Sequence, residues 1–509
     1  MGSSAVTARN ILLTGLTAGT LIACGGGGGG NSSATAPGDG TNTEPVLTNA
    51  QGYVLDNQGI ANPWLTAEPN SDAARDITVD TAAVRMGLLD ANGNRAVSVD
   101  GSGQRIAYYD SEFNENHEQL AQRRGTTTRQ DSYHRLDANE ELTAGVYDHG
   151  TLGASLAAGR HGVAPGADLD LYAATAATPS DPDLGGTLYA FSGNPFDFIG
   201  AAAARGTDVI NYSADLGQLG ARQVRLDDIK AIDSNGIVFV KAAGNSGNAI
   251  IPGDLYGADL GNDGNFLTQA DFIDYLANDT RPGGLGVLVG AANADHTGIA
   301  PFSNRPGGVR NLDTGQRLGS ESFITAPGSF VPGAKTSADG TEDALIGEAS
   351  GVSFAAPIVT GTVALMLERW EQLSPDEAVG VIFETADRDF PAYEASLSQA
   401  RIDALNDRLN ALYGTSTADI TLESDRYDYT LSPVFGHGLL DIQAALSPQG
   451  TPTVATGMSV DDGGVPVAET SLVTGAAFGD GLADSAALGN ATFIDRYGRD
   501  FAIDMNARV

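Results

Sequence analysis

Residues 353–370 read SFAAPIVTGTVALMLERW, a run of helix length whose apolar residues fall on almost every face. A proline is tolerated in a helix only within the first turn, so Pro357 predicts that the helix begins at about Ser353. Beyond it, Gly361 and the apolar run Val363–Leu367 leave no broad polar face for solvent. A helix that is apolar all round lies inside a protein. The stretch therefore predicts a core built around one buried helix.

Short apolar runs and helix-like stretches alternate along the rest of the central chain. Four runs bounded by turn residues predict buried strands: Arg105–Asp110, Asp208–Ser213, Gly236–Asn245 and Gly284–Asn293. Further helices are predicted over Asp197–Gly206, Val224–Asn235 and Ser374–Asp387. The last of them opens with an N-cap serine, a proline and two acidic residues. This alternation predicts an α/β fold, a doubly wound, mostly parallel sheet with helices on both faces.

Three reactive side chains stand where such a sheet presents its sites, at the junctions that follow strands or open helices. Asp110 ends a predicted strand, and Ser353 opens the long apolar helix. His149 precedes the alanine-rich stretch Ala154–Ala158. Asp, His and Ser are the residue types of a nucleophilic triad, in which a base activates a serine hydroxyl.

Several short motifs, taken in order, resemble the subtilisin (S8) family of serine peptidases. The stretches that carry the resemblance are IAYYDSEFNENHEQL (106–120), DHGTLGASLAAG (148–159), GVAP (162–165), KAAGNSG (241–247), APFSN (300–304), TAPG (325–328), EASGVSFAAPIVTG (348–361) and GHGLLD (436–441). The order Asp, His, Ser along the chain is also that of the subtilisins. The resemblance extends over about residues 105–446 and implies the subtilisin-like fold.

The resemblance implies a serine endopeptidase with Asp110, His149 and Ser353 as its triad and Asn245 as the oxyanion donor. Subtilisins bind extended peptides as an added strand. The stretch INYSADLG (210–217) resembles one wall of that cleft, so substrate-binding residues are expected at the positions Ser213, Ala214, Gly217 and Gly244.

Three residues beside these motifs depart from the family pattern. Leu152 stands where a second histidine is usual, Val352 where threonine usually precedes the nucleophile, and Glu112 where glycine is common. They affect the expected specificity and pH optimum more than the expected activity. Two alternatives to an endopeptidase stay open. One is a catalytically silent surface binding module on a subtilisin scaffold, and the other is an esterase or amidase for small substrates.

Charge and composition restrict the partners. With 28 Lys and Arg against 64 Asp and Glu, the formal net charge of −36 argues against nucleic acid as a partner. Such a surface suits a saline habitat, although an acidic exported protein is an equally good interpretation. No cofactor is expected and no metal ligands are assigned. The oxygen-rich stretch 259–271 fails the EF-hand pattern at Gly261 and Ala270. A structural calcium ion nevertheless remains compatible with the family resemblance.

The N-terminal segment has the pattern of an export signal and a tether. The apolar run Ile11–Ala23 is too short to span a bilayer and fits a secretory signal. Its end, residues 21–24 (LIAC), resembles the lipobox of bacterial lipoproteins, which implies lipid attachment at Cys24, the only cysteine. A plain signal peptide is the alternative. A glycine-rich spacer follows, and it suits a domain held off a membrane.

These features predict four segments. Residues 1–24 are a lipoprotein-type signal peptide, and 25–85 a flexible tether with a poorly patterned arm. Residues 86–447 are the peptidase domain, although 49–100 could be a prosegment, a wrapping arm or part of the core. Residues 448–509 are a linker, whose strand-like end (488–505) resembles the junction before an autotransporter barrel, with the barrel itself absent. The expected location is the bacterial outer membrane or cell surface, or release outside the cell.

Overall fold

The structure is a computed structural model. It describes residues 46–67, 77–110, 112–121, 125, 127–129, 145–173, 198–213, 223–247, 266–268, 284–306, 309–310, 317–318, 321–336, 343–390, 431–450, 453–454, 465–466 and 491–503. The chain divides into two compact units, Ala34–Pro448 and Met1–Ser33 with Gln449–Val509.

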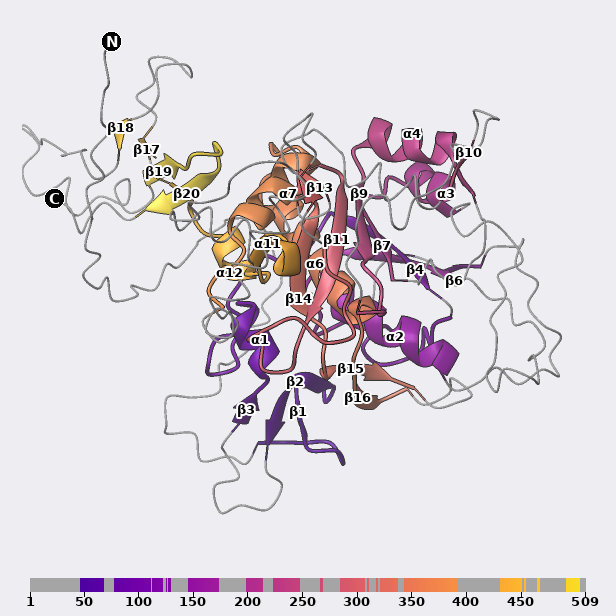
Figure 1. The fold of residues 1–509 in the computed structure, drawn as a ribbon. Coiled ribbons are helices and arrows are strands. Elements are labelled where there is room, and N and C mark those ends of the chain that lie inside the picture. Colours follow the sequence, from indigo (N-terminus) through magenta and orange to yellow (C-terminus); the bar gives the residue numbers. More distant parts are fainter. Residues whose placement is uncertain are drawn as a thin grey trace, which may run out of the picture. The chain divides into compact units, whose positions relative to one another are not determined.

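A seven-stranded sheet forms the centre of the larger unit (Figure 1), and all neighbouring strands in it are parallel. In spatial order its strands are β14 (Phe323–Pro327), β11 (Gly286–Ala292), β9 (Val238–Ala242), β7 (Val209–Tyr212), β4 (Arg105–Asp110), β6 (Asp168–Ala173) and β5 (Thr127–Arg129). The strand order reverses between β4 and β7, which is the place where open α/β sheets bind ligands. The predicted doubly wound, mostly parallel sheet is confirmed.

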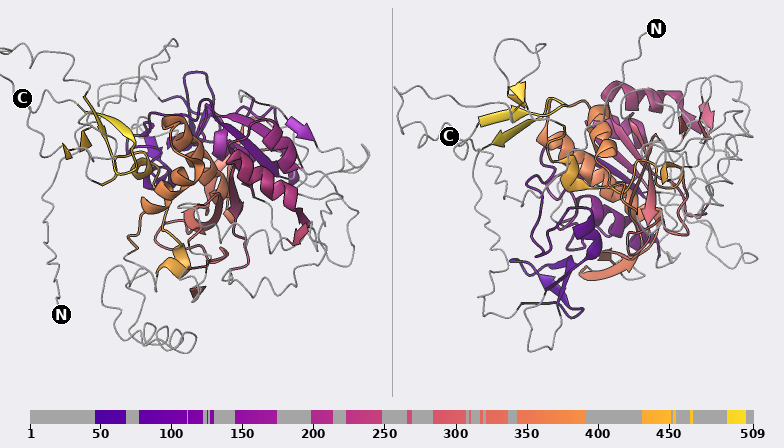
Figure 2. Two further views of the ribbon diagram at one scale, coloured as in Figure 1. Left: turned by 90° about the horizontal axis from the view of Figure 1, so that it is seen from above. Right: turned by 60° about the vertical axis from the view of Figure 1, so that its left-hand side comes forward.

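Helices cover both faces of this sheet, as the views in Figures 1 and 2 show. On one face α6 (Val352–Arg369) lies across β7, β9, β11 and β14, beside α2 (Gly145–Ala158). On the other face α3 (Phe198–Ala204) stacks Phe198 on Tyr109 and Tyr212, next to α4 (Leu226–Asn235).

The helix α6 is the centre of the core, as its sequence predicts. Every residue from Val352 to Leu367 is buried, and the helix begins one residue before the predicted start at Ser353. Among the described helices it alone is long and apolar enough to cross a membrane. However, 89% of its 18 residues are buried inside the protein. It is followed by α7 (Pro375–Glu384), where Ser374 and Glu377 form a capping box.

The arm before the central sheet has more structure than its weak sequence pattern predicts. It forms a three-stranded antiparallel sheet of β1 (Tyr53–Leu55), β2 (Ala61–Ala67) and β3 (Ile77–Val79), followed by α1 (Thr81–Arg85). Its contacts with the core explain why it is ordered.

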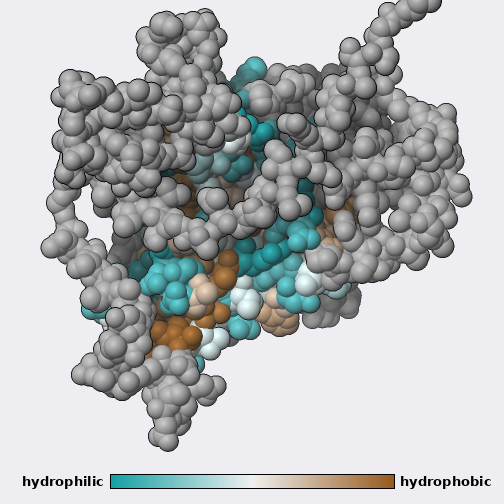
Figure 3. Space-filling view, turned by 90° about the vertical axis from the view of Figure 1, so that its left-hand side faces the viewer, coloured by the Kyte–Doolittle hydropathy of each residue, from teal (hydrophilic) through white to brown (hydrophobic). Residues whose placement is uncertain are grey.

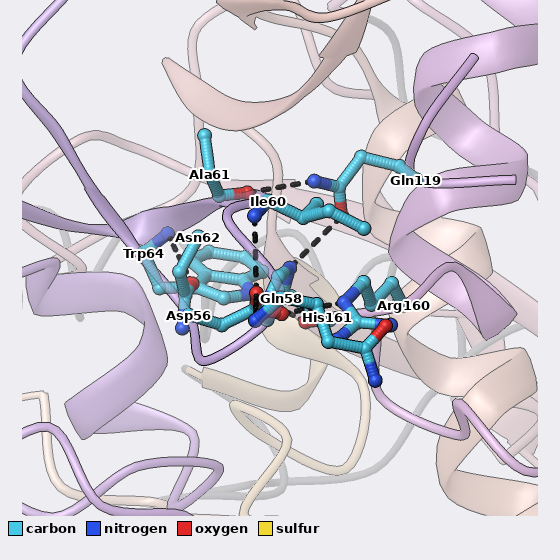
Figure 4. A network of polar contacts seen from close by, with 9 residues as sticks. All are labelled: Asp56, Gln58, Ile60, Ala61, Asn62, Trp64, Gln119, Arg160 and His161. Carbon is cyan, nitrogen blue, oxygen red and sulfur yellow. Dashed lines mark hydrogen bonds and ion pairs between the residues drawn. The ribbon is translucent and has the colours of Figure 1, made fainter. Parts of the chain in front are cut away.

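Polar contacts attach the arm to the turn after α2 and to a hairpin of β15 (Val331–Lys335) and β16 (Leu345–Ala349). The buried Trp64 donates its indole N–H to the carbonyl of His161 at 2.9 Å. Asp56 pairs with Arg160 at 2.5 Å and lies 3.3 Å from His161 (Figure 4). Gln51 exchanges two amide hydrogen bonds with the backbone of Ile346. Tertiary contacts, rather than local propensity, therefore stabilise the arm.

The remaining elements are short. In the larger unit they are β8 (Gln223–Arg225), β10 (Phe266–Thr268), β12 (Val309–Arg310), β13 (Arg317–Leu318), α11 (Ser432–Phe435) and α12 (Ile442–Ala445). In the smaller unit, β17 (Thr453–Val454), β18 (Val465–Pro466), β19 (Ala491–Ile494) and β20 (Asp500–Ile503) form an antiparallel sheet. The single strand-like pattern over 488–505 thus corresponds to a hairpin, whose turn is held by the buried Asp495–Arg499 ion pair.

Few large apolar side chains are exposed in the described part of the chain. Leu47, Val84 and Phe330 are more than a third exposed and lie far apart in the sequence. On the face in Figure 3, the described residues are mainly hydrophilic and the apolar ones form small groups.

Candidate active site

Asp110 and His149 meet at the carboxyl end of β4, beside the position where the strand order reverses. Asp110 is the last residue of β4 and is only 3% exposed. His149 lies in α2, and its Nδ1 is 2.8 Å and 2.9 Å from the two carboxylate oxygens of Asp110. Because Nδ1–H donates to the carboxylate, Nε2 is the nitrogen whose lone pair can accept a proton.

The electrostatics of this pair favour a basic imidazole. Burial lowers the pKa of His149, but the negative charge of Asp110 and the hydrogen bond to it outweigh burial, so the pKa lies above its usual 6.5. The side chain of His149 is still 34% exposed. A bound molecule can therefore reach it, while Asp110 beneath it is shielded from water.

Close packing of α2 against the loop after β4 brings the two side chains together. A side chain at Gly150 would collide with the carbonyl oxygen of Glu112 and with the ring of Phe113, so only glycine permits this approach. Leu152, one of the departures from the family pattern, is buried and packs against Gly333 of β15. The backbone of α2 thus runs close to the end of β4.

Ser353 lies in the first turn of α6 and is 6% exposed. Its hydroxyl donates to the backbone oxygen of Ser213 at 3.0 Å, and the hydroxyl of Ser213 donates to the carbonyl of Ser353 at 2.9 Å. Ser213 follows β7 directly, so both strands at the reversal point contribute to the site. In this state the hydroxyl of Ser353 contacts the end of β7 rather than the imidazole.

Asn245 lies in the loop after β9 and has a defined amide orientation. Its Oδ1 accepts the backbone N–H of Val352 at 3.0 Å, which directs Nδ2 as the group available to donate to a ligand. The backbone N–H of Ser353 is in the first turn of a helix, where N–H groups lack a partner within the helix. The two donors and the helix dipole suit a developing negative charge.

Two further residues, Asn304 and Phe354, contribute to the shape of this site. The side-chain amide of Asn304 donates to the carbonyl of Ala243 at 2.8 Å, and its backbone N–H donates to the carbonyl of Gly244 at 2.9 Å. Phe354 places its ring centroid 5.2 Å from that of His149. Asn304 stands in the motif 300–304 and Phe354 in the motif 348–361, but neither motif by itself assigns these side chains a role.

The other predicted site residues are only partly covered by the structure. Ser213 and Gly244 lie at the site, Gly244 with a φ of +104° that favours glycine. Ala214, Gly217 and Cys24 lie outside the described residues, as does the stretch 259–271 except for residues 266–268, which form β10. Within the described ranges, no group of three or more His, Cys, Asp or Glu is placed to hold a metal ion.

Comparisons with known proteins bear on the family of the chain. The sequence model of the family described as "Peptidase_S8: Subtilase family" matches residues 101–427. A search of the curated proteins found no match.

Among solved structures, a cold-adapted subtilisin-like serine proteinase is 21% identical, with 60% of this chain and 90% of that chain covered and a TM-score of 0.38. A protease from Pseudoalteromonas arctica is 19% identical over 69% and 91% of the two chains, with a TM-score of 0.41. Fervidolysin from Fervidobacterium pennivorans is 18% identical over 81% and 51%, with a TM-score of 0.44.

Proposed function

The chain belongs to the subtilase family of serine peptidases, and we propose on that premise that it is a serine endopeptidase with Asp110, His149 and Ser353 as its catalytic triad. The observation that carries the proposal is the contact of His149 with Asp110 at 2.8 Å, at the sheet position where Ser353 also lies. Proteins or peptides are the substrates that this family implies.

In the proposed mechanism Ser353 Oγ attacks the carbonyl carbon of the peptide bond while Nε2 of His149 takes the hydroxyl proton. Asp110 holds the imidazole by Nδ1 and stabilises the imidazolium that forms. The oxyanion receives hydrogen bonds from Nδ2 of Asn245 and the backbone N–H of Ser353.

His149 then protonates the leaving amine, and an acyl-enzyme on Ser353 remains. Water hydrolyses this ester in a second addition and elimination, with His149 again as base and then acid. Before substrate binds, the hydroxyl of Ser353 donates to Ser213. Catalytic hydrogen bonds often form only in the substrate complex, so a rotation of the Ser353 side chain toward His149 belongs to the proposal. No step requires a metal ion or cofactor.

Labelling with a serine-directed fluorophosphonate tests the proposal. Label on the parent that is lost in Ser353→Ala, but kept in the control Ser234→Ala on the exposed side of α4, would support an activated nucleophile at residue 353. A folded parent that takes no label would favour a silent binding module instead. Peptide and small-ester substrates assayed side by side would separate an endopeptidase from an esterase.

We also propose that the chain is exported and anchored at the bacterial outer membrane or cell surface through a lipid on Cys24. The support is the apolar run Ile11–Ala23, which ends in a lipobox-like LIAC followed by a glycine-rich spacer. We expect the parent to incorporate labelled palmitate. The Cys24→Ser variant should take up no label and should be released into the medium. Unlabelled parent protein in the medium would favour a plain signal peptide.

A further inference from the structure

A chain of buried hydrogen bonds runs from the middle of α6 to the residue behind Ser353. The hydroxyl of Thr360 donates to Oδ1 of Asn211 at 2.9 Å, and Nδ2 of Asn211 donates to the hydroxyl oxygen of Ser213 at 2.8 Å. The Ser213 hydroxyl then donates to the carbonyl of Ser353 at 2.9 Å. The Thr360 hydroxyl also lies 3.1 Å from the carbonyl of Ala356 within α6, so its one proton is shared between that carbonyl and the shorter contact with Asn211. From Asn211 onward, each donor points toward Ser353.

The chain ends at a carbonyl that its own helix cannot satisfy. In an α-helix each carbonyl accepts a hydrogen bond from the N–H four residues later. For Ser353 that residue is Pro357, which has no N–H to donate. The hydroxyl of Ser213 supplies the missing donor. Since the backbone oxygen of Ser213 also accepts the hydroxyl of Ser353, Ser213 holds both the main chain and the side chain of that residue.

Tyr108 extends this chain on its other side. Its hydroxyl lies 3.4 Å from that of Ser213, whose only proton is given to Ser353, so Tyr108 is the donor in this longer contact. The tyrosine fits because Gly153 of α2 has no side chain, and a Cβ there would collide with the Tyr108 hydroxyl. All these groups are excluded from water, with Tyr108, Asn211 and Thr360 each 0% exposed.

We propose that Thr360 and Asn211 are positioning residues for the nucleophile, acting through Ser213, which fixes the location of Ser353 at the start of α6. Neither Thr360 nor Asn211 contacts the triad directly. Thr360 fixes the orientation of the Asn211 side-chain amide. That orientation determines whether Asn211 presents its N–H or its oxygen to the hydroxyl of Ser213. This inference rests on the proposed function, because it assumes that Ser353 is the nucleophile.

Loss of the chain should reduce the rate of acyl-enzyme formation more than substrate affinity. A nucleophile displaced by a fraction of an ångström reacts more slowly, whereas the cleft that binds the peptide is unchanged. We expect Thr360→Val, which keeps the side-chain shape but removes the hydroxyl, to lower kcat about 10-fold with KM little changed. Thr360→Ser, which restores the hydroxyl, should recover most of kcat.

Thr362→Val is the matched control. Thr362 is equally buried in α6, but its hydroxyl bonds only to the carbonyl of Ile358 within the helix. Steady-state kinetics and the second-order rate of fluorophosphonate labelling are measured on all variants, and thermal melts check that each is folded. If Thr360→Val does not fold, Ser213→Ala carries the test with the same readouts, because it removes only one hydroxyl oxygen.

The outcomes separate this inference from the proposed function. A parent that takes no label at Ser353 overturns the proposed function itself. A parent that is labelled and cleaves peptides, with Thr360→Val behaving as Thr362→Val does, overturns only the positioning chain. A fall in kcat that Thr360→Ser does not rescue, at equal folded fraction, also counts against the chain.

Discussion

At the scale of single residues, the orientation of the Asn245 amide supports its proposed role as oxyanion donor. Its Oδ1 is occupied by the Val352 N–H at 3.0 Å, so only Nδ2 is directed to a ligand. We predict that Asn245→Ala lowers kcat by about 10²–10³-fold, the range known for loss of this donor in a subtilisin, with KM little changed. Asn235→Ala, on α4 away from the site, is the control. Equal kcat in Asn245→Ala and the parent would contradict the assignment.

The raised pKa of His149 predicts the acid limb of the pH profile. The imidazole must be neutral to take the proton of Ser353, so kcat/KM falls when the pH drops below the pKa of the free enzyme. Because Asp110 raises that pKa above 6.5, the midpoint of this limb should lie above pH 6.5.

Asp110→Asn removes the charge that raises the pKa of His149. Its acid limb should therefore move to lower pH, together with a large loss of kcat because the imidazole tautomer is no longer fixed. The measurement is kcat/KM from pH 5 to 9 for both proteins. A limb that does not move would show that Asp110 does not set the pKa.

The site could be predicted from sequence to the extent that its residues stand in short motifs. The structure places Asp110, His149, Asn245 and Ser353 at the carboxyl end of the sheet, and their catalytic roles stay a prediction. The direction of the Ser353 hydroxyl could not be predicted, because it depends on the end of β7, more than a hundred residues away. The sequence likewise does not indicate that the Tyr108 hydroxyl needs a glycine at position 153, because this contact forms only when β4 packs against α2.

At the scale of elements, the arm depends on a largely buried histidine in the turn after α2. His161 receives contacts from Asp56 and Gln119 and is adjacent to Arg160. Burial lowers its pKa to about 4, assisted by Arg160 and opposed by Asp56. The folded protein therefore keeps His161 neutral at a pH where the unfolded chain would protonate it.

This difference predicts a loss of stability on acidification. Between pH 6.5 and pH 4 the unfolded state binds the additional proton, so the free energy of unfolding decreases as pH falls, by on the order of 3 kcal/mol from this residue. His161→Gln should flatten that part of the curve. Urea unfolding of the parent and the variant at pH 7, 5.5 and 4.5 measures the difference, and parallel curves would refute it.

Elements were predictable where the sequence pattern was local. The predicted strand Arg105–Asp110 matches β4 residue for residue, and the start of α7 follows from its cap. The strands of the arm were missed because Trp64 and Gln51 find their partners far along the chain, at His161 and Ile346. Long-range contacts of this kind leave no periodic signal in the sequence.

At the scale of the whole molecule, the charge of −36 predicts a dependence of stability on salt. Folding gathers carboxylates that are farther apart in the unfolded chain, so their repulsion destabilises the compact state. The screening length falls from about 10 Å at 0.1 M to about 3 Å at 1 M salt, and most of this repulsion is then removed. The melting temperature should therefore rise with NaCl concentration.

Thermal melts from 0.05 to 1 M NaCl at pH 7.5 measure this effect, and sucrose at matched osmolality controls for preferential exclusion. Near the isoelectric point, at about pH 4.2, the net repulsion disappears, so added salt should have a much smaller effect there. A rise at pH 7.5 that exceeds the sucrose control and shrinks toward pH 4.2 would support adaptation to salt. A melting temperature that is flat with NaCl at pH 7.5 would mean that the acidic residues are spaced widely enough for solvent alone to screen them, and the saline-habitat interpretation would then be wrong.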